Sequence, residues 1–321
     1  MTSMEPDVLV VGAGVSGLTT AVCLAEAGCR VVVAAADPPL RTTSAAAGAI
    51  WGPHLVGMDD RVDKWSLRTL ATLTELAADP ATGVRVATGT FATRAGQSEP
   101  AEWVDAIGSS RPCAPAELPA GFAGGRRLTV PIVSMTVYLG YLAARLTRAG
   151  AELQPAEFGS LAEAAALTPA PVIVNCTGIG ARRIVQDNDL VPVRGQVVIA
   201  RNPGLSEFLV GAGDAPHDFT YYFPHGDLVL LGGTEESGNW SLEPDPATAE
   251  RILRACAAAE PRLAGVEVIE HRVGLRPVRP SVRLEEEDLD GRRVLHNYGH
   301  GGAGVTLSWG CAEDVAAAAA R

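Results

Sequence analysis

Lysine is almost absent from this chain of 321 residues, in which Lys64 is the only one. Acidic residues number 37 against 26 lysine and arginine residues, which gives a formal charge of -11. Because a nucleic-acid site needs a basic face to neutralise phosphates, this balance argues against nucleic acid as a partner. Fixed repeats and long polar tracts are also missing, so collagen-like and disordered chains are excluded.

Cysteine and histidine are sparse, and neither shows a metal-binding spacing. None of the six cysteines forms a CxxC pair, and His296 and His300 flank a predicted turn. The segment before the first apolar run carries Glu5 and Asp7, where a targeting peptide would have basic residues. We therefore expect a cytoplasmic protein with reduced cysteines, no bound metal and no membrane partner.

The first 36 residues predict one strand-helix-strand unit. An apolar run over 7–11 ends in the sequence GAGVSG (12–17), after which apolar residues recur at helical spacing up to Gly28. A β-branched run follows over 30–36. This order is typical of a parallel α/β domain.

The later segments alternate less regularly between helix and strand. The expected elements are helices over 59–78, 134–150 and 246–260, loops over 94–125, strands over 172–174, 196–200, 220–223, 227–231 and 266–272, and a final glycine-rich loop and helix over 297–320. The length and the 47% share of hydrophobic residues suit two domains. We expect a Rossmann-like domain formed by 1–49, 125–185 and 268–321, interleaved with a mostly antiparallel α+β domain formed by 50–124 and 186–267.

The glycines of the first turn predict a dinucleotide site. Gly12, Gly14 and Gly17 have GxGxxG spacing between strand and helix, and Val15 and Ser16 open the helix. Such a turn lets the backbone approach a pyrophosphate at the positive end of the helix. A glycine-rich turn without a ligand is the plainer reading, and the motif does not distinguish FAD from NAD.

Two further segments are candidates for contact with the same ligand. Asp37, just beyond the second strand, could bind a ribose, although a solvated turn aspartate fits equally well. The run over 42–50 combines hydroxyls with very small residues, which suits backbone lying against a flat ring, although a plain loop fits as well. Its candidate contacts are Thr42, Thr43, Ser44, Gly48, Ala49 and Ile50.

Five ordered segments resemble the D-amino acid oxidase family of FAD enzymes. They are VNCTG (174–178), LGG (231–233), GNW (238–240), GLRPVRP (274–280) and HNYGHGG (296–302). The resemblance extends over most of the chain. Five matches in the family order are more specific than one GxGxxG, and they imply noncovalent FAD as the cofactor.

The resemblance implies roles for three residues at the substrate. Arg276 matches the family arginine that pairs with the substrate carboxylate, and Tyr221 matches the tyrosine that bonds to the same group. The carbonyl of Gly302 would accept a hydrogen bond from the substrate amino group. The alternatives are an arginine that fixes sheet geometry, an aromatic that packs on a strand face and a glycine needed only for its φ freedom. Tyr222 should face away from Tyr221.

The resemblance also places the C-terminal loop on the flavin. Its implied contacts are Gly301, Gly302, Gly304, Val305 and Thr306. Cys311 follows on the same helix, and we interpret it as a packing residue without a bond to the flavin.

The implied activity is the oxidative deamination of neutral D-amino acids by dioxygen, which gives 2-oxo acids, ammonia and hydrogen peroxide. A D-aspartate oxidase is the close alternative, because His54 resembles that subgroup. Gly302 follows the neutral-substrate pattern, and residues 202–225 offer only His217 and His225, with no lysine or arginine, for a second carboxylate. A glycine or secondary-amine oxidase, an NAD(P)-linked dehydrogenase and a redox-inactive binding protein are further alternatives, and a homodimer is left open.

Two positions depart from the family pattern. Ala36 stands where an arginine often lies beside Asp37, and the segment 211–220, which contains His217, is shorter than the lid of many members. The adenosine contacts and a gating lid therefore stay open questions at the level of sequence.

Overall fold

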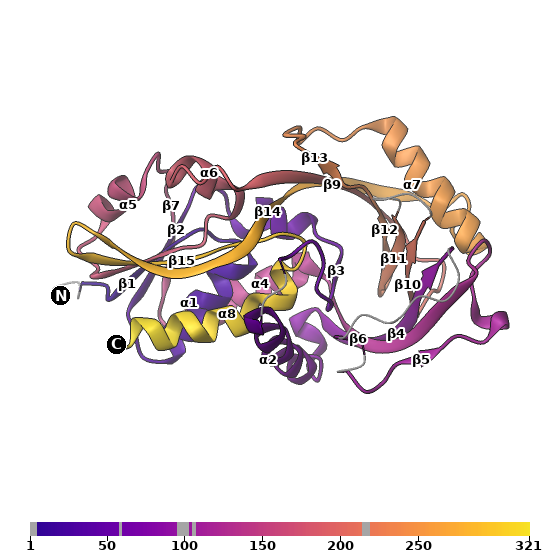
Figure 1. The fold of residues 1–321 in the computed structure, drawn as a ribbon, viewed down its shortest axis with the longest axis horizontal. Coiled ribbons are helices and arrows are strands. Elements are labelled where there is room, and N and C mark those ends of the chain that lie inside the picture. Colours follow the sequence, from indigo (N-terminus) through magenta and orange to yellow (C-terminus); the bar gives the residue numbers. More distant parts are fainter. Residues whose placement is uncertain (1–4, 58–59, 95–102, 105–106, 214–218) are drawn as a thin grey trace.

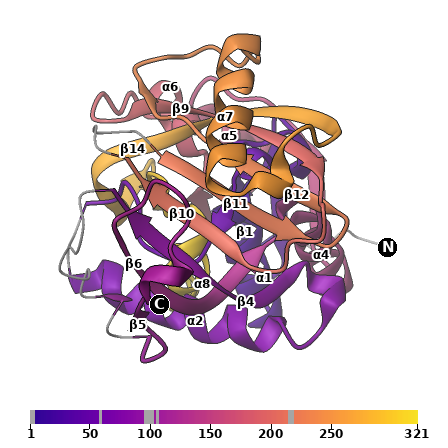
Figure 2. The same ribbon diagram turned by 90° about the vertical axis from the view of Figure 1, so that its right-hand side faces the viewer.

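A computed structural model of the chain describes residues 5–57, 60–94, 103–104, 107–213 and 219–321 (Figures 1 and 2). The helices are α1 (Val15–Glu26), α2 (Asp60–Leu76), α4 (Met135–Arg148), α5 (Leu161–Leu167), α6 (Ala181–Ile184), α7 (Pro246–Ala259) and α8 (Gly304–Ala319). The strands are β1 (Val8–Val11), β2 (Val31–Ala35), β3 (Ala49–Ile50), β4 (Val84–Thr93), β5 (Arg111–Pro112), β6 (Gly124–Val133), β7 (Glu152–Pro155), β8 (Val172–Asn175), β9 (Val191–Arg201), β10 (Phe208–Ala212), β11 (Phe219–His225), β12 (Leu228–Gly232), β13 (Glu236–Ser237), β14 (Val268–Leu289) and β15 (Arg292–His300). No helix within these described ranges combines the length and apolar character needed to span a bilayer.

The strand-helix-strand unit predicted at the N-terminus is confirmed. β1 pairs in parallel with β2 and with β8, so Val8 lies beside Val31 and Val172. Alternate residues of β1 enter two buried clusters, one shared with α1, α4 and α8 and the other with α5. Figure 1 shows α1 and α8 along one side of these strands. A strand buried on both faces needs the continuous apolar run seen in the sequence.

The antiparallel sheet predicted for the middle of the chain is also confirmed, and it is larger than the sequence indicated. β9 to β12 are extended by β4 and β6, which pattern reasoning missed, and β6 begins inside the range expected to be loops. Gly89 weakens the strand pattern of β4, but a Cβ there would overlap the ring of Phe208 on β10. α7 covers this sheet through a separate buried cluster.

β14 joins the two parts of the sheet. It pairs with β9 over 268–278 and with β15 from Val278 onward, with a register shift between Val278 and Arg283. The expected strand at 266–272 is only its beginning, because the prolines that follow interrupt the strand pattern. Among the described strands one 15-stranded sheet therefore runs through both predicted domains. β6, which the sequence assigned to the Rossmann-like domain, pairs with β3 and β4, and the domain boundaries stay a prediction.

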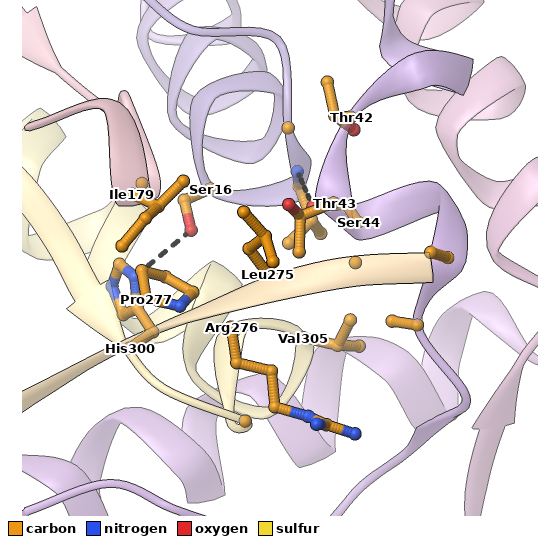
Figure 3. Close-up of a pocket in the computed structure, with 18 of the residues that line it drawn as sticks. Ser16, Thr42, Thr43, Ser44, Ile179, Leu275, Arg276, Pro277, His300 and Val305 are labelled. Atoms are coloured by element: carbon orange, nitrogen blue, oxygen red, sulfur yellow. Dashed lines mark hydrogen bonds between the residues drawn. The ribbon is translucent and has the colours of Figure 1, made fainter. Parts of the chain in front are cut away.

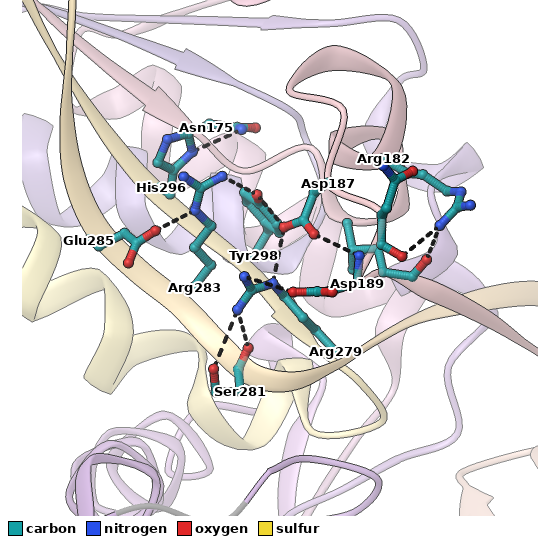
Figure 4. Close-up of polar contacts among 12 residues, drawn as sticks. Asn175, Arg182, Asp187, Asp189, Arg279, Ser281, Arg283, Glu285, His296 and Tyr298 are labelled. Carbon is teal, nitrogen blue, oxygen red and sulfur yellow. Dashed lines mark hydrogen bonds and ion pairs between the residues drawn. The ribbon is translucent and has the colours of Figure 1, made fainter.

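A buried polar network fastens β14 to its neighbours (Figure 4). Asp187 accepts hydrogen bonds from Arg279 Nε at 3.0 Å and from the Tyr298 hydroxyl at 2.8 Å. Arg283 Nη1 donates to the hydroxyl oxygen of Tyr298 at 2.7 Å. Burial opposes ionisation of Asp187, but the Tyr298 hydrogen bond and the Arg279 charge outweigh it and lower the pKa of Asp187. The network links the loop before β9 to β14 and β15.

Replacement Asp187→Ala should lower the free energy of unfolding by about 3 kcal/mol, because it removes the carboxylate that bonds to both Arg279 and the buried Tyr298 hydroxyl and leaves Arg279 only the longer ion pair with Asp189 at 3.7 Å. Urea unfolding measures the change. The control is Arg201→Ala, which breaks an exposed pair with Glu267 at 3.6 Å and should cost about 0–1 kcal/mol. Equal losses in the two variants would contradict the role given to the network.

Candidate active site

A cavity of about 580 Å³ extends from the carboxyl ends of β1, β2 and β8 to β11 and β14. It gathers nearly all of the predicted site residues, although they come from distant parts of the sequence. Those that line it are Gly12, Gly14, Val15, Ser16, Asp37, Thr42, Thr43, Ser44, Gly48, Ala49, Ile50, Tyr221, Arg276, Gly301, Gly302, Gly304, Val305 and Thr306. Figure 3 shows the part of this cavity that lies around β14.

The turn between β1 and α1 is rich in glycine because the backbone of neighbouring segments lies too close to it to leave room for side chains. Gly12 has a φ of +113°, and a Cβ at this position would overlap the carbonyl oxygen of Cys176. A Cβ at Gly17 would overlap the carbonyl oxygen of Gly12. Gly17 thus supports the turn from within the helix and does not itself line the cavity.

The N-terminus of α1 faces the cavity. Gly14, Val15 and Ser16 line it there, and the first turn of the helix contains no acidic residue. Val15 N donates to the Ser44 hydroxyl at 3.0 Å, a bond drawn in Figure 3. The positive end of the helix dipole and its first N–H groups therefore form a site that suits a phosphate.

The small residues at 42–50 are packed between two walls of the cavity. A Cβ at Gly274 of β14 would lie 3.3 Å from the carbonyl oxygen of Thr43. On the other side, a Cβ at Gly48 would lie 3.1 Å from the ring of Tyr221. These close approaches leave little room for larger residues at 42–50.

Arg276 projects from β14 into the cavity (Figure 3). Its Nη1 donates to the carbonyl oxygen of Thr234 at 2.9 Å, and a Cβ at Gly195 of β9 would lie 2.6 Å from the same nitrogen. Within the described residues no carboxylate forms an ion pair with Arg276. A guanidinium that is held by a backbone carbonyl and faces a cavity suits a bidentate carboxylate ligand.

Tyr221 lies beside Arg276 on the inward face of β11. A Cβ at Gly232 or Gly233 would overlap the Tyr221 ring or its hydroxyl, so these two glycines form a flat surface beneath the side chain. Burial raises the pKa of Tyr221 against the opposing charge of Arg276, and the hydroxyl therefore stays protonated as a donor. Tyr222 faces the opposite way and packs in the cluster beneath α7.

The glycine loop before α8 is held between β14 and the segment after β3. Gly301 has a φ of +56°, and its N–H donates to the carbonyl oxygen of Pro277 at 3.0 Å. A Cβ at Gly301 would overlap the carbonyl oxygen of Leu55, and one at Gly302 would lie 2.7 Å from Cδ2 of His54. Side chains are thus excluded from the loop at both positions.

The start of α8 completes this wall. Gly304 and Val305 line the cavity, while the Thr306 hydroxyl donates to the carbonyl oxygen of Gly52 at 3.0 Å and accepts from its N–H at 3.2 Å. Thr306 therefore also fastens the segment after β3 to the helix. Cys311 lies further along α8 in a buried apolar cluster and outside the cavity lining.

A histidine–carboxylate pair that the sequence did not reveal lies in the same cavity. His54 Nε2 donates to Glu235 Oε1 at 2.6 Å, and the Glu235 side chain is only 4% exposed. The two residues are 181 positions apart, so only the fold brings them together. His54, considered for a second substrate carboxylate, is thus bound to an acidic residue.

Other residues of the lining were also missed or placed differently. The turn over 177–180 after β8 also lines the cavity, which could have been expected because ligands bind beyond the carboxyl ends of parallel strands. His225, the other candidate base near Tyr221, lies outside the lining. His217 falls outside the described residues.

The sequence model of a family described as FAD dependent oxidoreductase matches residues 7–318, which include every wall of this cavity. The chain belongs to this family. This FAD-dependent oxidoreductase is 50% identical over 314 residues to the D-amino-acid oxidase of Rubrobacter xylanophilus, with 97% of this chain and 95% of the relative covered. It is 46% identical over 315 residues to the D-amino-acid oxidase of Streptomyces coelicolor, with 97% and 96% covered.

Its fold is similar to that of the glycine oxidase from Geobacillus kaustophilus, with a TM-score of 0.83 at 20% identity, covering 99% of this chain and 95% of that chain. The mixed α/β fold expected from the sequence is thus confirmed.

His300 connects two walls of the site in this FAD-dependent oxidoreductase. Its Nδ1 lies 3.4 Å from the Ser16 hydroxyl oxygen (Figure 3), and its Nε2 lies 3.0 Å from Oδ1 of Asn297. Burial lowers the pKa of His300 from 6.5 to about 4. The folded protein thus keeps this ring neutral over a range in which the unfolded chain protonates it.

Acidification from pH 6.5 to pH 4 should therefore lower the stability of the FAD-saturated protein, because the unfolded state binds the extra proton first. His300→Gln should weaken this pH dependence. Thermal unfolding of both proteins across the window measures the difference. Identical pH profiles would contradict the assignment to His300.

Proposed function

We propose that this chain is a D-amino acid oxidase. The overall reaction converts a D-amino acid, dioxygen and water into a 2-oxo acid, ammonia and hydrogen peroxide. The observation that carries the proposal is the placement of Arg276 and Tyr221 in one cavity with the glycine turn of α1. In this proposal one cavity therefore contains both a dinucleotide site and a carboxylate site.

The cavity residues fit FAD. The backbone at Gly14 and Ser16 offers N–H groups to the phosphates at a turn where Gly12 and Gly17 leave no room for a side chain. We propose that Asp37 contacts the ribose, and that 42–50 and 301–306 hold the ring system. When bound, the flavin supplies an acceptor for the hydride from the substrate Cα and a route for the electron pair to dioxygen.

The protein's own residues bind and orient the substrate. Arg276 and the protonated Tyr221 hydroxyl donate to its carboxylate, and the Gly302 carbonyl accepts from its amino group. Three fixed anchors determine whether the single hydrogen at Cα faces the ring, so only one enantiomer is productive. Orientation is the main contribution to the rate, because the reaction needs no nucleophile from the chain.

Neutral substrates are favoured over acidic ones in this proposal. The arginine in the cavity near Tyr221 is Arg276, which one carboxylate neutralises, and His54 is already bound to Glu235. A second carboxylate on the substrate would enter without a cationic partner among the described residues of this wall. An unpaired buried charge of this kind is costly.

The proposal also includes a cytoplasmic location and the division into two interleaved domains given by the sequence. All six cysteines are free in the structure, which supports a reducing compartment. A homodimer stays a hypothesis, and the molecular mass in solution decides it.

Peroxide formation from paired enantiomers tests the proposal. The FAD-loaded enzyme should oxidise neutral D-amino acids, while L-enantiomers should react at least about 10³-fold more slowly because their Cα–H faces away from the ring. D-aspartate should be a poor substrate compared with D-alanine. Equal rates for both enantiomers, or no peroxide from any D-amino acid, would overturn the proposal.

Arg276→Ala should reduce kcat/KM for neutral D-amino acids by about 10²-fold or more, mainly through KM, since it removes a charge-assisted contact with the carboxylate. FAD content, read from the absorbance of the purified variant, should change little. The conservative Arg276→Lys should recover only part of the loss, because the ammonium lacks the bidentate fork. Unchanged kinetics in Arg276→Ala would remove this residue from the site.

A further inference from the structure

Glu235 lies one residue beyond the carbonyl that holds the substrate-binding arginine. The backbone continues from Gly232 and Gly233, which support Tyr221, to Thr234, whose carbonyl oxygen accepts from Arg276 at 2.9 Å. Glu235 follows directly and lines the same cavity. The Glu235 carboxylate therefore lies on the cavity wall next to the place where Arg276 would hold the carboxylate of a bound amino acid.

The backbone that carries Glu235 is held in place by hydrogen bonds and an ion pair with β9. Gln196 N donates to the Thr234 hydroxyl at 2.9 Å, and the next residue, Glu236, pairs with Arg194 at 2.9 Å. The Arg194 side chain is only 2% exposed and also donates to the carbonyl oxygens of Ser241 and Glu243. These contacts hold the segment 234–243, so Glu235 is presented to the cavity on a rigid support.

The His54 partner places this carboxylate between the anchors of the substrate. His54 lies against Gly302, where a Cβ would be 2.7 Å from Cδ2, and its ring meets Phe219 edge-on at 5.6 Å. The pair thus spans from the Arg276 wall to the loop whose carbonyl would accept from the substrate amino group. The side chain of a substrate held by Arg276 and the Gly302 carbonyl would therefore lie against this pair.

The charge of Glu235 reaches the carboxylate anchor. Burial is the largest cause of the raised pKa of Tyr221, and the negative charge of Glu235 raises it further while Arg276 lowers it. A field that acts on Tyr221 also acts on a ligand bound between Tyr221 and His54. A charge at a binding site weakens the binding of ligands with the same sign and favours ligands with the opposite sign.

We propose that Glu235 is a specificity-determining residue that makes the side-chain subsite acidic, so that D-amino acids with a cationic side chain are accepted and those with a second carboxylate are rejected. This inference rests on the proposed function, and it names D-lysine and D-arginine as substrates beside the neutral ones. It also assigns the rejection of D-aspartate and D-glutamate to a repulsive group, beyond the mere lack of a cation.

The test compares substrates that differ in charge and little in shape. kcat/KM is measured for D-lysine against D-norleucine, and for D-glutamate against D-glutamine, in the FAD-loaded wild type and in Glu235→Gln. The variant should lower the lysine-to-norleucine ratio about tenfold and raise the glutamate-to-glutamine ratio about tenfold, since one charge has been removed. The control Glu207→Gln removes a carboxylate whose side chain is 54% exposed and should leave both ratios unchanged.

Ratios in Glu235→Gln that stay within about threefold of the wild type would overturn the inference. A second measurement needs no turnover. Hexanoate, 6-aminohexanoate and adipate are titrated into the wild-type and Glu235→Gln holoenzymes, and binding is followed by the flavin absorbance. Wild type that binds 6-aminohexanoate more tightly than hexanoate and adipate more weakly, with both preferences reduced in the variant, supports the inference, and any other result contradicts it. If no D-amino acid gives peroxide, the proposed function fails, while this titration still decides the role of Glu235.

Discussion

The pairing of β14 with β9 on one side and β15 on the other is the constraint on which the site depends. Within four residues, β14 places Gly274 against Thr43, Arg276 against the Thr234 carbonyl and the Pro277 carbonyl against Gly301. Three walls of the cavity thus take their positions from one stretch of backbone. A register slip of one residue would turn Arg276 to the opposite face and separate all three.

Local pattern predicted those parts of the fold in which one element determines its own conformation. The apolar run of β1, the glycine turn and α1 could be read in this way, because the phosphate-binding geometry is contained in a few consecutive residues. β4 could not, since Gly89 satisfies the packing of Phe208, more than one hundred positions away in the sequence. The full length of β14 could not be predicted, because prolines interrupt the strand pattern where its pairing changes from β9 to β15.

The same distinction applies to the site. The resemblance of short segments identified Arg276, Tyr221 and the glycine loop, and the structure brings them into one cavity. The pairing of His54 with Glu235 had no local signal, because the two residues are 181 positions apart in the sequence. His54 was considered as a contact for a second substrate carboxylate from its resemblance alone. In the structure it is bound to the carboxylate of Glu235, so it brings a negative charge to this wall instead of a free cation.

The two ends of a bound amino acid would meet walls of different construction. In the proposed binding mode its carboxylate meets Arg276 and Tyr221, which rest on Gly195, Gly232 and Gly233, where added side chains would collide with them. Its side chain meets a wall that includes the side chains of His54 and Glu235. The second wall can therefore change by substitution, while the first tolerates almost no larger residue. Descendants of this chain can thus accept different substrate side chains and still bind the amino and carboxylate groups in the same way.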